Sequence, residues 1–378
     1  MAETLISPGV LARENDQSFL TARPVTVGAA IIGPTVKGPV EIPTLVTTYN
    51  QFANTFGSIL ESGSANDKAS YSYLTSIAAY NYFLNGGESM LVARVVSGSY
   101  TAASSSIIAS GYGATTASFT LETLSKGANQ NSTSTEVSGA LESGSGENLR
   151  WQIVNPNTSS GTFNLLIRRG NDNPLFPVVL ETWTNLSLDP NSPNFISKVI
   201  GDQVSSYNSQ NNQIQITGDF ANRSSYVRVK TLNYSTLNYF DNNGLPKDQY
   251  TASLPINYSS SFGGASGAIK GGANFYQNIN SSNTQGLVGS NYDNMINLLS
   301  NQDDYKFNVL LTPGLIDELH TSQVTNIITN TQNRGDNIYV LDLVDYGSAL
   351  TSVTAQASAR NSSYAASDRK STRLKSSH

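Results

Sequence analysis

VGAAIIGPTVKGPVEIPTLVTTYNQFANTFG, residues 27–57, is the stretch that decides the fold. It opens with a short apolar run closed by the Gly-Pro pair at 33–34, which predicts a buried strand followed by a turn. Thr47 and Thr48 are each able to cap a helix. The apolar side chains that follow recur at helical spacing: Tyr49, Phe52, Ala53 and Phe56. The stretch therefore predicts a strand, a loop and a short amphipathic helix that ends at Gly57.

A second helix and a second strand follow directly. Helical spacing predicts a helix over residues 71–85, which the glycine pair 86–87 ends. The apolar residues that keep this spacing are Tyr73, Ile77, Tyr80 and Leu84. MLVARVV, residues 90–96, then predicts another buried strand.

The pattern of amphipathic helices and buried strands returns near residue 291. Tyr292, Met295, Ile296 and Leu299 predict an amphipathic helix. FNVLLT, residues 307–312, predicts a strand, after which Pro313 and Gly314 are expected to turn the chain into a helix. The apolar stripe expected for that helix is Ile316, Leu319, Val324, Ile327 and Ile328. Residues 337–343 predict a further buried strand, and this strand–helix–strand order implies a parallel or mixed sheet covered by helices.

The middle of the chain is different. Ser, Thr, Asn and Gly dominate between about residues 99 and 289, and short alternating segments are separated by turn-forming clusters. The segments are residues 118–124, 150–154, 162–168, 213–216 and 226–230. This pattern is typical of β-rich domains with long loops. GGASGAIKGG, residues 263–272, predicts a flexible hinge that leads out of this region.

Composition excludes some classes of function. Only 13% of residues are charged, against ~25% in typical soluble domains. Such a surface can be covered by a neighbour without burying many ionised groups. The formal charge of −5 argues against direct nucleic-acid binding, and the absence of Cys excludes disulfides and Cys-based metal sites. No basic start precedes an apolar run, and no stretch reaches the ~18 apolar residues of a membrane span, so we expect a soluble protein made in the cytoplasm.

The sequence shows no recognisable set of catalytic residues. His320 and His378 are the two histidines, and His320 is expected to be a packing or boundary residue within an amphipathic helix. GPTVKGP, residues 33–39, lacks the residue order of a phosphate loop. DNNG, residues 241–244, favours a hairpin turn over a calcium loop. The best place for a hidden site is at the strand ends, residues 312–314 and 342–345, where open α/β sheets bind ligands.

The first 24 residues show no sustained helical or strand period. They are nevertheless more apolar than a solvated tail needs, which predicts an arm that binds a partner, with a frayed terminus as the alternative. The residues expected to make the contact between subunits are Leu5, Ile6, Val10, Leu11, Phe19 and Leu20.

Several of these segments together resemble the contractile tail sheath family of myophages, whose relatives include bacteriocin and type VI secretion sheaths. The resemblance lies in SPGV at residues 7–10 with Glu14 shortly after, in residues 27–57 and 78–96, and in RNSSYAA at residues 360–366. The family implies subunits that stack as rings in a helical tube around an inner tail tube. Terminal arms add strands to the sheets of neighbouring subunits.

The resemblance implies a structural protein of the virion, assembled in the bacterial host cytoplasm, with no enzymatic activity, cofactor or metal. Expected partners are other copies of the chain, the inner tail tube protein, and the baseplate and tail terminator proteins. Contraction is a rigid-body shift between two packings of the subunits that drives the tube through the host envelope during genome ejection. Neither direct nucleic-acid binding nor membrane insertion is expected.

The sequence thus predicts an α/β (α+β) core assembled from both chain ends, with inserted β-rich, sandwich- or barrel-like domains. The expected divisions are an N-terminal arm at 1–24, the first half of the core at 25–98, the β-rich insertion at 99–289 and the second half of the core at 290–366. Residues 367–378 turn abruptly basic where the family continues into a further strand and arm. We expect that tail to be non-native and the core to be truncated there, a natural basic tail being the alternative.

Two hypotheses of other classes stay open on the sequence. The Ser-, Asn- and Thr-rich β region is also typical of an extracellular adhesin or surface-layer protein. An α/β enzyme with a site at Asp342 is the other.

Overall fold

The computed structural model describes residues 27–64, 67–111, 116–132, 136–137, 140–141, 146–173, 175–268 and 278–364. Its central feature is a five-stranded sheet in the order β18-β17-β1-β5-β2. The strands are β1 (Val27–Gly33), β2 (Thr44–Val46), β5 (Met90–Arg94), β17 (Phe307–Ile316) and β18 (Ile338–Asp342). β1 lies in the middle and pairs in parallel with both β17 and β5, so segments almost 300 residues apart in sequence lie side by side. The expected core from both chain ends is confirmed.

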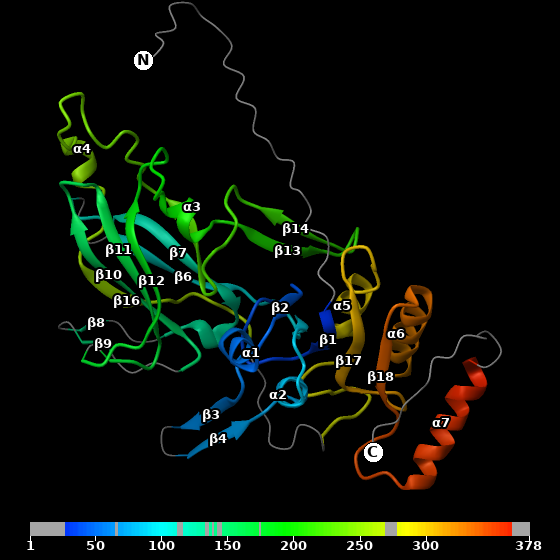
Figure 1. The fold of residues 1–378 in the computed structure, drawn as a ribbon. Helices are drawn as coiled ribbons and strands as arrows, with labels where there is room; N and C mark the ends of the chain where they lie inside the picture. The colour runs from blue at the N-terminus through cyan, green and yellow to red at the C-terminus, as the bar shows by residue number, and fades with distance from the viewer. Residues whose placement is uncertain are drawn as a thin grey trace, which may run out of the picture.

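Helices cover both faces of this sheet and make three layers (Figure 1). On one face, α1 (Tyr49–Phe56) and α2 (Leu74–Leu84) share an apolar cluster with β1 and β5. On the other face, α5 (Asp293–Leu298), the 3-10 helix η2 (Gly289–Tyr292) and α6 (Thr321–Arg334) share a second cluster with β1, β5, β17 and β18. α7 (Leu350–Tyr364) stands apart from the sheet in Figure 1.

The strand and the helix of the fold-deciding stretch form as predicted, but the predicted loop between them contains a short strand, β2, which pairs with β5. Thr48 caps α1 by accepting a hydrogen bond from the Gln51 N–H at 3.1 Å, and Gly57 follows the helix with a φ of 73°. Phe52 and Phe56 are buried against the sheet. The apolar run of the strand, and the cap and apolar spacing of the helix, are all visible in the local sequence. The local sequence was therefore enough to predict these two elements.

The orientation of α2 was not predictable from its spacing. Ile77, Tyr80 and Leu84 keep helical spacing but are 44%, 47% and 65% exposed. The helix instead presents small residues to the sheet, among them Thr75, because β1 approaches it closely. A Cβ atom on Gly33 would lie 2.2 Å from the Thr75 Oγ1. Three residues of the predicted stripe therefore lie on the outer surface, whereas the fourth, Tyr73, is buried.

The predicted turn at Pro313 and Gly314 is wrong. β17 continues to Ile316 through a register shift, and α6 begins only at Thr321. The loop before η2 holds the irregular segment of β17 at Pro313 and Gly314. The Thr284 Oγ1 donates to the Gly314 carbonyl at 2.6 Å, and the Gln285 Nε2 donates to the Pro313 carbonyl at 3.2 Å. These contacts come from the tertiary fold, and a local pattern does not indicate them.

The β-rich part is built from two sheets that share one apolar cluster. One has the order β12-β11-β10-β16 and the other β15-β7-β6. Phe119 and Phe163 stack between them with ring centroids 5.6 Å apart. The strands are β6 (Ala102–Ile108), β7 (Ala117–Lys126), β10 (Leu149–Asn157), β11 (Thr162–Arg169), β12 (Val179–Ser187), β15 (Val227–Leu232) and β16 (Tyr258–Ser261). The expected β-rich insertion is present, beside the core in Figure 1.

Smaller elements complete the described chain. Three hairpins pair β3 (Leu60–Ser64) with β4 (Asp67–Tyr71), β8 (Glu136–Val137) with β9 (Ala140–Leu141), and β13 (Val204–Asn208) with β14 (Gln213–Thr217). The short helices are η1 (Ala128–Gln130), α3 (Ile196–Ile200) and α4 (Asp248–Thr251).

The predicted hinge is fixed in its described part. Residues 263–268 run along the start of β6: Ser104 and Gly263 form a bridge, the Ala128 N–H donates to the Gly267 carbonyl at 2.8 Å, and the Tyr100 hydroxyl donates to the Ala268 carbonyl at 2.6 Å. The remaining residues of that prediction, 269–272, lie outside the described residues.

Candidate interaction surfaces

The predicted contact residues of the arm are not placed by the structure. Leu5, Ile6, Val10, Leu11, Phe19 and Leu20 lie outside the described residues, as does the basic tail at 367–378. Their role stays a prediction, and candidate surfaces must be sought in the described part of the chain.

His320 has a structural environment. It is 3% exposed and is the N-cap residue of α6, whereas the sequence placed it inside a helix. Its Nδ1 accepts a hydrogen bond from the Ile316 N–H at 3.1 Å, and burial lowers its pKa. Within the described ranges, no group of three or more His, Cys, Asp or Glu side chains is arranged to hold a metal ion. His320 supports the turn between β17 and α6.

The strand ends at 312–314 and 342–345 border a cavity of about 300 Å³. Its walls are mostly apolar: Leu74, Ile279, Gly314, Ile316, Leu341, Leu343, Val344 and Val353, with Asp342 and Tyr346. The Asp342 side chain lies at the exposed mouth, and partial burial raises its pKa. The hydroxyls of Thr312 and Tyr339, which do not line the cavity, are 2.7 Å apart and hydrogen-bonded to each other. One carboxylate among apolar walls does not supply an acid–base pair.

The DNNG segment forms a turn, as predicted. Asp241 Oδ1 accepts hydrogen bonds from the N–H groups of Asn243 and Leu245, both at 2.8 Å, and Gly244 has a φ of 79°. Its carboxylate is therefore used to close the turn.

The central sheet has open edges. β18 pairs with β17 on one side, and along its other side the described part of the chain supplies no strand. Ile338, the first residue of β18, is 56% exposed. β2 is the opposite edge, and Leu45 within it is 38% exposed. Strand edges with unmatched backbone groups and apolar side chains are sites where another strand can pair.

A groove of about 370 Å³ lies between the start of α1 and the end of α2. It is lined by Thr47, Thr48, Tyr49, Asn50, Tyr80, Phe83, Leu84 and Gly87, of which none is charged. The rings of Tyr49 and Tyr80 meet edge to face with centroids 5.0 Å apart and shape one wall. The outward-facing residues of α2 therefore form an uncharged, largely aromatic surface, which we call the α1–α2 groove.

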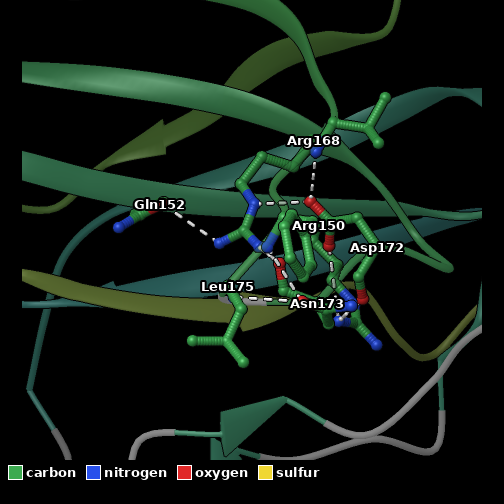
Figure 2. Close-up of polar contacts among 8 residues, drawn as sticks. Arg150, Gln152, Arg168, Asp172, Asn173 and Leu175 are labelled. Carbon is green, nitrogen blue, oxygen red and sulfur yellow. Dashed lines mark hydrogen bonds and ion pairs between the residues drawn. The ribbon is translucent and has the colours of Figure 1, made fainter.

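A second apolar surface is the tip of the β11–β12 hairpin. Leu175 and Phe176 are 84% and 75% exposed, more than any other large apolar side chain that the structure describes. Beneath them, Asp172 accepts hydrogen bonds from Arg168 at 2.7 Å and from Arg150 at 3.4 Å (Figure 2). All three of these charged side chains are buried. We call Leu175 and Phe176 the hairpin tip.

Two further buried arginines come from segments that carry the sequence resemblance. Arg94 in β5 donates from Nη1 to the carbonyl oxygens of Gly38 and Lys126, at 2.7 and 2.8 Å, and so joins the core to β7. Burial lowers the pKa of Arg94 to about 10. Arg360 in α7 forms an ion pair with the buried Asp317. Sequence reasoning missed both roles, although an arginine inside the apolar run 90–96 was a signal.

No protein-family model and no curated protein matches the chain. Two solved structures are similar: a sheath tail protein from Listeria innocua, at 9% identity and a TM-score of 0.41, and a sheath tail protein from Desulfitobacterium hafniense, at 11% and 0.36. They match 85% and 92% of this chain. The chain spans 48% and 60% of their lengths. These values describe a loose likeness, from which no conclusion about function follows.

Proposed function

We propose that this chain is a structural subunit of a contractile tail sheath, which polymerises helically around an inner tail tube. In this proposal the sheath contracts to drive the tube through the host envelope, and the subunit catalyses no reaction. Its partners are other copies of the chain, the tail tube protein, and the baseplate and terminator proteins. In this proposal the assembled subunit is a component of the virion.

The open edge of β18 is the observation that carries this proposal. The sheet pairs strands from the first and last parts of the described chain, and among the described residues no strand pairs with the outer side of β18, so a strand from another copy can pair there. Strand addition of this kind is head-to-tail: the donor arm and the acceptor edge are different parts of the chain. Such contacts propagate as an open helix unless the rotation closes.

The low charge of the chain supports the same function. With 13% charged residues, much of the surface can become interface at a modest desolvation cost. Within the subunit, buried hydrogen bonds join distant parts of the chain, such as those from Arg94 to the carbonyl groups of Gly38 and of Lys126 at the end of β7. The subunit can then move as a rigid body when neighbouring interfaces rearrange. None of the helices in the described residues is long and apolar enough to cross a membrane.

Deletion of residues 1–23 tests the proposal. These residues hold all six predicted contact side chains, whereas the described core starts at Val27. The shortened chain should show the circular dichroism and melting temperature of the parent but sediment as a monomer, while the parent forms tubes visible by electron microscopy. Normal tubes from the shortened chain would contradict the arm's role.

A further inference from the structure

Side chains at the base of the hairpin tip hydrogen-bond to its described backbone N–H groups. Asn173 Oδ1 accepts hydrogen bonds from the N–H groups of Leu175 and Phe176, at 3.0 and 2.9 Å. Asp172 Oδ2 accepts another from the Val178 N–H at 2.9 Å. Every backbone donor named here is fixed by a side chain at the base of the tip, so the two apolar side chains project from a preorganised turn.

The base of the tip buries two arginines beside a single carboxylate. Arg150 and Arg168 both face the single carboxylate of Asp172, and the three side chains are at most 2% exposed. Arg168 also donates to the Gln152 Oε1 at 3.0 Å, and Figure 2 shows Leu175 pointing away from this cluster. Burying ionised groups is costly unless they are well paired, and their replacement by apolar residues is often neutral or stabilising. The cluster therefore fixes geometry more than it adds stability.

In the isolated subunit, exposure of the apolar side chains of Leu175 and Phe176 to water is unfavourable in free energy. Burial of such side chains against a partner is favourable because it removes apolar surface from water. A rigid pair of exposed apolar residues loses little conformational freedom on binding, which is the property of an interface hot spot. The tip is thus suited to enter an apolar recess on a partner.

The same chain offers an uncharged recess, the α1–α2 groove, in which Tyr80, Phe83 and Leu84 stand beside polar residues. The α1–α2 groove has no charged lining residue, and Leu84 at its edge is 65% exposed, so no part of the described chain covers it. The charges beside the two surfaces are opposite in sign: Arg169 is exposed at the base of the tip, and Glu88 is exposed next to the groove residue Gly87. An apolar centre with a complementary charged rim is the usual anatomy of a protein interface.

We propose that the hairpin tip of one copy docks into the α1–α2 groove of another copy, with Arg169 facing Glu88 at the rim. The chain carries a net charge of −5, which makes an anionic lipid surface a poor alternative partner for the tip. Because the tip and the groove are different surfaces, the contact is head-to-tail and repeats from copy to copy. This contact rests on the proposed function, for which it supplies a second link between subunits.

Cross-linking tests the contact directly, because the chain has no Cys of its own. A Phe176→Cys protein is mixed with a Leu84→Cys protein and treated with a short bis-maleimide. We expect a covalent dimer in the mixture and at least about tenfold less in either variant alone. The matched control replaces Leu84→Cys by Ile216→Cys, a site of similar exposure at 59%. Equal cross-linking to the control position would overturn the proposal.

A charge exchange provides the second measurement. Arg169→Glu and Glu88→Arg should each raise the concentration needed for assembly, and the double variant should restore it. No rescue and no cross-link, in a wild-type chain that forms tubes, would overturn this contact and leave the sheath proposal intact. A cross-link without tubes would support the contact and count against the sheath. Flotation with phosphatidylserine vesicles that requires Phe176, without a cross-link, would overturn the contact in favour of a lipid partner.

Discussion

Buried arginines join parts of this chain that are distant in sequence. Arg94 links β5 to the loop at Gly38 and to β7, and Arg360 links α7 to the end of β17 through Asp317. A guanidinium is suited to this because it offers five donors in a fixed plane. These contacts hold the subunit together as one body, and each can be tested alone.

Glu122 gives a prediction about pH. Burial opposes its ionisation, but the hydrogen bond from Lys230 and the charge of Arg228 outweigh burial, so its pKa lies below the ordinary value. Because the pKa of Glu122 is lower in the folded than in the unfolded chain, where it is ~4.3, its ionised form stabilises the folded state. This stabilisation is complete above pH ~4.3 and is lost as the pH falls through the pKa of the folded state. Glu122→Gln should therefore cost about 1 kcal/mol in urea unfolding at pH 7 and close to nothing near pH 3. An equal loss at both values would contradict this.

Arg360 gives a prediction about α7. Gln356 also donates to Asp317, at 3.0 Å, and most side chains of α7 between residues 350 and 359 are exposed or half-buried. Removal of one partner of a buried pair typically costs ~3–5 kcal/mol. Arg360→Gln should speed amide exchange throughout α7 while β1 and β17 stay protected. Ser358→Ala, on the exposed side of the same helix, is the control, and unchanged exchange in Arg360→Gln would contradict the assigned role.

At the scale of elements, the open edge of β18 is the feature on which assembly depends. Ile338 is 56% exposed there, and a lysine at an edge strand opposes pairing with another strand. Ile338→Lys should keep the wild-type melting temperature but sediment as a monomer. Ile216→Lys in β14, at similar exposure, should assemble normally. Assembly of both variants to the same extent would exclude β18 as the docking edge.

Sequence patterns predicted the elements whose signals are local. β1, α1, β5, α5 and β18 each carry their own apolar period and boundary residues, and each formed at or near the expected positions. The outward face of α2 and the late start of α6 were missed, because close approach of Gly33 and hydrogen bonds from Thr284 and Gln285 decide them. Those partners lie far away in sequence.

The candidate surfaces were less predictable than the fold. The sequence analysis assigned Leu175 and Phe176 to no element, since nothing local shows that Asp172 meets Arg150 beneath them. The α1–α2 groove likewise needs two helices to be placed on the sheet before it exists. Predicting an interface from a single sequence thus requires the pairing of distant residues, which a local period does not contain.

At the scale of the whole molecule, the chain combines an internally well-paired body with uncovered edges and apolar surfaces. Buried ion pairs, two apolar clusters around the central sheet and a third in the β-rich part hold the described residues together. Among the described residues, nothing covers the edge of β18, the α1–α2 groove or the hairpin tip.

The central claim is that another copy completes the sheet at β18. Cryo-electron microscopy of the assembled protein, at a resolution that separates strands, tests it most directly. We expect a helical tube in which a strand contributed by a neighbouring subunit lies along the open side of β18. A tube whose β18 edge is bare, or is covered by residues of the same chain, would contradict the account.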